Sequence, residues 1–200
     1  MAGSHIERFE RWRSRQAGHL AHLVQLVLDE VVPELEAAGL QRHANYAGNL
    51  SRSVSSTTIA LQRRSGLLWP TVEIEFPLRR KPLLGLTFAM LPETCYRFGE
   101  AGLEAISRLD ANAVEGDVAF SLCKRDGRNY DCDFGYGYFS LCPTRRIRAE
   151  VDALKLRLPW LIEVLNAGIP ADWMALPRAC PAGQYARVSV RSPRLDGPAK

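Results

Sequence analysis

Residues 71–90 read TVEIEFPLRRKPLLGLTFAM, two strand-like segments on either side of a basic turn. Large apolar side chains alternate with small or polar ones along both segments, which is typical of strands with one buried face. An antiparallel register can place every large apolar side chain of the hairpin on one face. Its pairs are Val72 with Phe88, Ile74 with Leu86, and Phe76 with Leu84. The sequence therefore predicts a one-sided antiparallel sheet that grows outward from this hairpin.

Three further segments have the same character and are bounded by Gly, Pro, Asp or Asn residues that end strands. They are residues 58–63, 118–124 and 133–141. The first extends the hairpin into a three-strand meander. A loop at 126–129 is expected to join the other two as a second hairpin, with Phe120 beside Tyr136 and Leu122 beside Phe134.

Two amphipathic helical regions frame these strands. Apolar residues recur every three or four positions over 6–38 and over 144–165, and a glycine follows each region. Pro33 and Pro159 are expected to interrupt them, because proline lacks an amide proton and its ring clashes with the preceding turn. We predict an α+β domain with an antiparallel sheet of about five strands, a meander plus a hairpin, packed on N- and C-terminal helices.

Length and composition are those of one globular domain. The chain has 200 residues, of which 46% are hydrophobic and 24% charged. We assign residues 1–185 to a single α+β domain and 186–200, rich in Arg, Ser, Pro and Gly, to a disordered basic tail. The longest apolar stretch, 20–28, is far short of the roughly 20 residues that a membrane span requires. No export signal is recognisable at the N-terminus, so we expect a cytoplasmic protein without a membrane partner.

The cysteines and histidines do not have the spacing of a metal site. The five cysteines, Cys95, Cys123, Cys132, Cys142 and Cys180, include no C-x-x-C pair. We expect them to be free thiols, because structural zinc sites usually draw ligands from closely spaced pairs. His19 and His22 lack the four-residue spacing and intervening glutamate of a zinc protease. We therefore expect no metal and no cofactor.

Motifs for catalysis are not recognisable either. The chain has no G-x-S-x-G elbow, no phosphate-binding loop and no dinucleotide fingerprint, since the Gly-Tyr-Gly-Tyr sequence at 135–138 lacks the third glycine. His43 has no acidic neighbour in sequence that would orient it as a base. We therefore favour a protein that is not an enzyme.

The polar face of the predicted sheet carries two pairs of carboxylates. Glu73 and Glu75 are two apart on one strand and project from the same face, as do Asp131 and Asp133. Such pairs can hold a cation or divide acid and base roles, although alternating acidic residues are also typical of a solvated sheet face. Small residues surround them, which leaves room for a partner to lie against that face. These residues are Gly85, Ala89, Ala119, Gly135 and Gly137.

Charge is distributed unevenly along the chain. Residues 41–90 and 143–200 each carry a net +5, whereas 1–40 carry −2 and 91–142 carry −4. Clustered Lys and Arg side chains and a pI of 8.9 are compatible with nucleic acid. The clusters fall at opposite ends of the predicted meander, however, and no DNA- or RNA-binding pattern accompanies them. We do not expect nucleic acid as the partner.

The function we predict is protein binding without catalysis, in a small protein of bacterial type. Its contact residues would lie on the polar sheet face: Glu73, Glu75, Gln62, Thr87 and Asp133. The order of elements is similar to that of some toxin-neutralising immunity proteins, an analogy of fold that does not fix function. Two alternatives stay open. One is an enzyme that uses the same carboxylates with a metal or small ligand, and the other is weak nucleic-acid binding through the basic tail. The sequence leaves the partner's identity and the oligomeric state undetermined.

Overall fold

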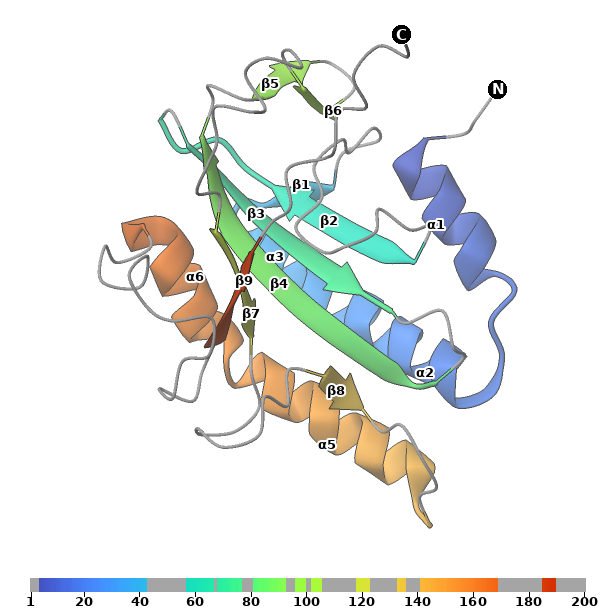
Figure 1. Cartoon of the computed structure of the whole chain (residues 1–200). Helices are drawn as coiled ribbons and strands as arrows, with labels where there is room; N and C mark the ends of the chain where they lie inside the picture. Colours follow the sequence, from blue (N-terminus) through green and yellow to red (C-terminus); the bar gives the residue numbers. More distant parts are fainter. Residues whose placement is uncertain are drawn as a thin grey trace, which may run out of the picture.

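The computed structural model describes residues 4–42, 57–66, 68–76, 81–92, 96–99, 102–105, 118–122, 133–135, 141–168 and 185–189. These residues form an antiparallel sheet with helices from both ends of the chain packed against it (Figure 1). The predicted α+β class is confirmed. None of the described helices is long and apolar enough to span a membrane.

The N-terminal helical region begins at Ser4. The Ser4 hydroxyl accepts a hydrogen bond from the Glu7 amide, and the Glu7 carboxylate accepts one from the Ser4 amide. This capping box satisfies two amides that a helix end leaves without partners. Four elements follow in chain order: α1 (His5–Arg13), α2 (Gly18–Leu26), the π-helix η1 (Val27–Val31) and α3 (Val32–Ala37).

Gly18 and Pro33 act differently on this region. Gly18 begins α2 with a φ of +62°, so a new helix starts there. Pro33 lies in the first turn of α3 and does not break the chain of helices; the π-helix η1 precedes it directly. In the π-helix the backbone hydrogen bonds join residues five apart instead of four. This departure from the α-helical pattern comes directly before the turn that contains Pro33, which has no amide proton to donate.

The C-terminal helical region consists of α5 (Pro143–Lys155) and α6 (Leu158–Ala167). Pro159 was expected to interrupt this region, and it lies in the first turn of α6. Proline is tolerated there because the first amides of a helix have no partner within the helix. The break therefore falls at the turn Leu156–Arg157, which joins the two helices.

Within the described residues the main sheet has seven strands. Six follow one another in the order β1 (Gln41–Arg42), β2 (Thr58–Gln62), β3 (Leu68–Glu75), β4 (Leu83–Pro92), β7 (Val118–Leu122) and β9 (Tyr185–Ser189), and β8 (Asp133–Gly135) pairs with β4. A separate ribbon contains β5 (Tyr96–Gly99) and β6 (Gly102–Ala105). The predicted meander is confirmed, since Val72 lies opposite Phe88 and Ile74 opposite Leu86.

The last two predicted strands exist, but their pairing differs from the expectation. Phe120 in β7 lies opposite Phe88, and Phe134 in β8 lies opposite Leu84, so both strands share one edge of the ten-residue β4. The predicted pair of Leu122 with Phe134 is therefore wrong, because β9 occupies the other edge of β7. Tyr136 lies outside the described residues. Strand β9 extends from 185 to 189, into the stretch assigned to a tail, and 190–200 are likewise not described.

A single apolar core lies between the helices and the bulky face of the sheet. Strand residues such as Ile74 and Phe88 are fully buried together with Leu23 of α2 and Leu161 of α6. Phe9 of α1 packs on Phe76, with ring centroids 6.2 Å apart. Each helix therefore turns one apolar stripe toward the sheet, as its periodicity predicts.

Candidate functional site

The polar face of the sheet is buried over β2 and β3. Only 1% of Gln62 and 2% of Glu73 is exposed. Other residues of this face are buried as well: Thr58, Ala60, Thr71 and Ala89. A partner cannot reach Gln62 or Glu73 in this conformation.

A short chain of hydrogen bonds links the polar side chains of this face. The Gln62 amide nitrogen donates to Thr71 Oγ1 at 2.9 Å, and that hydroxyl donates to the carbonyl of Trp69 at 3.0 Å. Gln62 and Thr71 are also directly opposite each other in the β2–β3 ladder. Buried polar groups that are hydrogen-bonded in this way hold neighbouring strands in register.

The register does bring the other predicted contact residues close to one another. Glu73 lies opposite Thr87, and Glu75 and Asp133 both lie opposite Gly85, one from each neighbouring strand. Glu75 and Thr87 are half-buried, and the side chain of Asp133 lies outside the described residues. The predicted group is thus assembled by the fold, although two of its five members are inaccessible.

Gly135 does not provide open space for a partner. It is buried, with a φ of +118°, and a Cβ placed there would lie 2.0 Å from the Pro82 carbonyl oxygen. Its amide donates to the Glu150 carboxylate of α5 at 3.3 Å. The glycine is needed because β8 approaches the backbone that enters β4.

The carboxylates do not assemble with other ligands in the described part of the chain. No group of three or more His, Cys, Asp or Glu side chains there is arranged to hold a metal ion. Cys142, the one cysteine among those residues whose thiol is described, is free and exposed.

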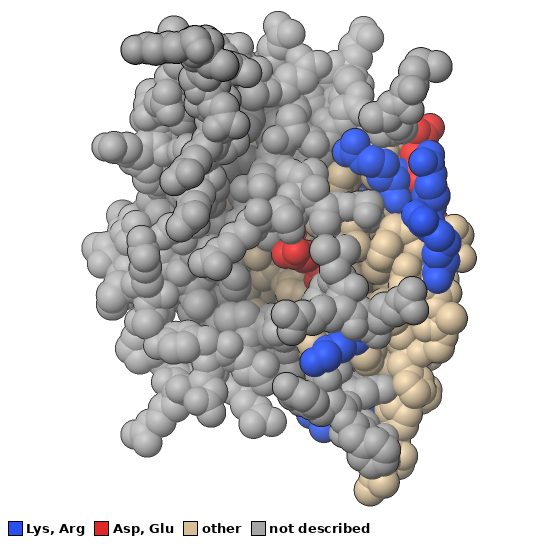
Figure 2. All heavy atoms as spheres, turned by 45° about the vertical axis from the view of Figure 1, so that its right-hand side comes forward, with Lys and Arg blue, Asp and Glu red and all other residues tan. Residues whose placement is uncertain are grey.

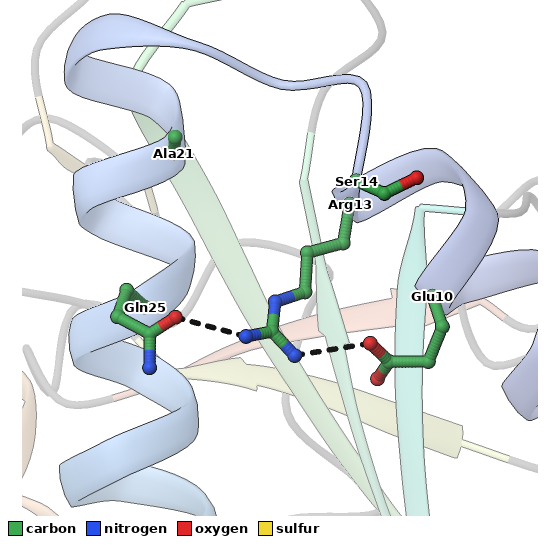
Figure 3. Close-up of a pocket in the computed structure, with 5 residues that line it drawn as sticks. All are labelled: Glu10, Arg13, Ser14, Ala21 and Gln25. Carbon is green, nitrogen blue, oxygen red and sulfur yellow. Dashed lines mark hydrogen bonds and ion pairs between the residues drawn. The ribbon is translucent and has the colours of Figure 1, made fainter.

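A pocket of about 320 Å³ lies between α1 and α2 (Figure 3). Its centre is occupied by Arg13, whose guanidinium donates to Glu10 at 3.0 Å and to Gln25 at 2.9 Å. Arg42 makes a second ion pair with Glu10 at 3.7 Å. Among the lining residues, the cation Arg13 is paired with the anion Glu10, so the lining carries no net charge.

A shallow groove of about 500 Å³ lies at the turn between α5 and α6. It is lined by Glu34, Asp152, Lys155, Leu156 and Pro159. Leu156 is 81% exposed, and Pro159 is exposed beside it. We call this feature the corner groove. Two of its lining residues are apolar and three are charged.

The charges around the corner groove are set by Glu30 of η1. Its carboxylate accepts hydrogen bonds from Arg148 and from Lys155, the latter at 3.1 Å, and Lys155 lies 3.7 Å from Glu34. The hydrogen bonds from Arg148 and Lys155 hold the pKa of Glu30 below its usual value, and that carboxylate raises the pKa of Lys155. Arg148 also lies 4.0 Å from Asp152. Because the three carboxylates outnumber the two cations, this cluster is acidic.

Within the described residues, the basic side chains that follow β2 do not form one surface. Arg63 is turned inward, where it donates to the carbonyl oxygens of Ala38 and Leu165. Arg64 lies over the Trp69 ring at 5.8 Å. On the face drawn in Figure 2, the described Lys and Arg side chains appear in separate groups. The basic turn 77–80 lies outside the described residues.

The corner groove is not among the predicted sites, although the sequence contains a signal for it. The apolar stripe of the C-terminal helices runs through Ile147, Val151, Leu154 and Leu158, all of which are buried. Leu156 is an apolar residue that falls off this stripe. Such a residue either packs against another element or stays exposed, and only the structure distinguishes the two.

Comparison with known proteins adds no relative to this description. No protein-family model, no curated protein and no solved structure matches the chain.

Proposed function

We propose that this protein is a non-catalytic protein-binding module whose contact surface is the corner groove. One observation carries the proposal: Leu156 exposes 81% of its surface within a groove that also contains the exposed Pro159. Transfer of a leucine side chain from water to an apolar contact is worth about 1.5–3 kcal/mol. Such a residue can anchor a partner.

The arrangement around Leu156 is similar to that of interface anchors in general. Interfaces commonly have an apolar centre surrounded by polar groups that exclude water and fix orientation. Here Asp152 and Lys155 come from the last turns of α5, and Glu34 comes from α3. Pro159 comes from α6, so three helices contribute to one surface.

The charges of the groove define the chemistry of its partner. The carboxylates Glu30, Glu34 and Asp152 pair with only two cations, Arg148 and Lys155. One negative charge is therefore left uncompensated and can attract a cation. Complementary charge steers association and selects among partners. The occupant we propose is a polypeptide segment with an apolar side chain flanked by Lys or Arg.

This proposal moves the binding surface away from the polar sheet face. Contact with a partner through Gln62 and Glu73 would require the fold to open, because both are almost completely buried. The corner groove needs no such change.

The test is affinity capture from nuclease-treated native lysate, with wild type, Leu156→Ser and a control, Leu68→Ser. Leu68 is another exposed leucine, 39% accessible, on β3. We expect one stoichiometric protein to be retained by the wild type and the control and lost with Leu156→Ser, and its contact segment to be basic and apolar. Equal retention by all three proteins, or retention of nothing, would contradict the proposal.

A further inference from the structure

The two most exposed large apolar residues of the described chain lie at the two ends of one helix. Leu141 is 87% exposed and directly precedes Cys142, the N-cap of α5. Leu156 is 81% exposed and is the C-cap of the same helix. Isolated exposed leucines are ordinary, but two at matched positions on one helix form a pattern.

Opposite charges accompany these leucines. Arg145 lies four residues after Leu141, and Asp152 lies four residues before Leu156. Arg145 and Asp152 are seven apart, two turns of helix, so they share one exposed face of α5. That face points away from Ile147, Val151 and Leu154, which are buried in the core.

The pattern is symmetric about the middle of the helix. Leu141 and Leu156 are equally far from the peptide that joins Arg148 to Ala149, and so are Arg145 and Asp152. If a second α5 is laid antiparallel on the first, Arg145 faces the partner's Asp152 and Leu141 faces the partner's Leu156. Each contact then occurs twice, as a two-fold interface requires.

We infer that the occupant of the corner groove is a second copy of this chain, which pairs through its α5 in antiparallel orientation. The inference rests on the proposed function, because it uses the same groove. The second copy supplies the required chemistry: Leu141 is an apolar anchor, and Arg145 is the adjacent cation. The ion pairs of α5 among the described residues involve Arg148, Asp152 and Lys155 but not Arg145 or its neighbour Arg146.

The centre of the exposed face of α5 permits close approach of a second helix. Ala149 is small and exposed, and the charge of Arg148 is neutralised by Glu30. Helices packed on small residues approach to the short end of the usual 8–10 Å range. The contact from Leu141 to Leu156 is only about 22 Å long at 1.5 Å per residue, so the dimer belongs with small, reversible interfaces.

The experiment is a charge exchange measured by sedimentation equilibrium over a concentration series. We expect the wild type to shift from the mass of one chain to that of two as concentration rises. Arg145→Asp and Asp152→Arg should each weaken dimerisation about tenfold, since each converts two attractive contacts into two repulsive ones. The double variant R145D/D152R restores both pairs with their signs reversed and should recover wild-type dimerisation.

Arg146→Asp is the matched control. It makes the same charge change at a neighbouring exposed position of α5, outside the face that Arg145 and Asp152 share. Dimerisation should therefore change little. All three positions altered are exposed, and circular dichroism should report the same fold in each variant. A dimer that is equally weakened by Arg146→Asp, or not rescued in the double variant, would overturn the inference.

The two proposals fail in different ways. A chain that is a monomer at every concentration, but loses a different captured protein with Leu156→Ser, contradicts self-pairing and leaves the binding function standing. If Leu156→Ser alters neither capture nor dimerisation, both proposals fail.

Discussion

Arg63 donates a hydrogen bond of 2.7 Å to the carbonyl oxygen of Ala38, which caps the C-terminal end of α3. The same guanidinium donates to the Leu165 carbonyl at 3.2 Å and to the side chain of Asn166 near the end of α6. Helix C-termini carry partial negative charge and unpaired carbonyls, so one cation at two of them is favourable. Arg63 therefore connects the sheet to helices from both ends of the chain.

Replacing Arg63 with methionine should lower the free energy of unfolding by about 1–3 kcal/mol, because hydrogen bonds from a charged donor are lost. Urea denaturation measures the change. Arg64→Met is the matched control, since Arg64 is exposed and stacks on one ring. Equal losses in the two variants would show that Arg63 does not hold the helix ends.

Gly135→Ala should destabilise the protein more than Gly168→Ala. Both glycines have positive φ values, +118° and +90°, so alanine is strained at either position. Only at Gly135 does the new Cβ meet backbone, at 2.0 Å from Pro82, whereas Gly168 has nothing within 4 Å. We expect a difference of about 2 kcal/mol between the two variants in urea denaturation. Equal effects would contradict the close approach of β8 to the start of β4.

Glu73→Lys should be far more damaging than Glu75→Lys. The two residues lie two apart on β3, but Glu73 is 2% exposed and Glu75 is half-buried. A buried lysine introduced without a designed partner costs about 3 kcal/mol or more, whereas a change at a partly solvated position usually costs less than about 1 kcal/mol. Thermal melting compares them. Two equally mild losses would indicate that the polar face is open, and would revive it as a binding surface.

Acid should destabilise the fold through His5. Burial, and then the charges of Arg8 and Arg42, lower the pKa of His5 from 6.5 to about 4. As pH falls from about 6.5 toward 4, His5 binds a proton in the unfolded chain but not in the folded chain. The free energy of unfolding therefore decreases. Below about 4 both states are protonated and the contribution stays constant.

The measurement is urea denaturation between pH 7 and pH 4 on the wild type, His5→Gln and His19→Gln. His5→Gln should lose less stability over this interval than the wild type, because it lacks the titrating ring. His19 is exposed and serves as the control. Identical pH profiles for the wild type and His5→Gln would contradict the shift.

Local sequence patterns predicted the meander correctly. The pairing of the later strands depended instead on which distant segments of the chain come together. Alternation in residues 71–90 defines which side chains share a face, and a single register satisfies it. The alternation around Phe120 and Phe134 also identifies buried side chains. It does not determine which strand each of these strands pairs with. The length of β4 allowed both strands to pair with it.

The candidate site was harder to predict for a related reason. Sequence alternation identified Gln62, Glu73 and Glu75 as one polar face, and the ladder agrees. Burial, however, depends on what the remaining chain packs against that face, which alternation does not encode. Leu156 is the opposite case, an apolar residue that is exposed. Because it lies outside the buried stripe of its helix, its exposure becomes clear only once its neighbours in the fold are known.

The pairing of β7 with β9 also dictates an order of assembly. The strands β2, β3 and β4 are consecutive in the chain, whereas Phe120 pairs with Arg187 across 66 intervening residues. Closing a longer loop costs more chain entropy before any contact compensates for it, and such contacts slow folding. We expect the meander to form early and β9 to join last, so during synthesis the sheet would be completed only after Ser189 had emerged.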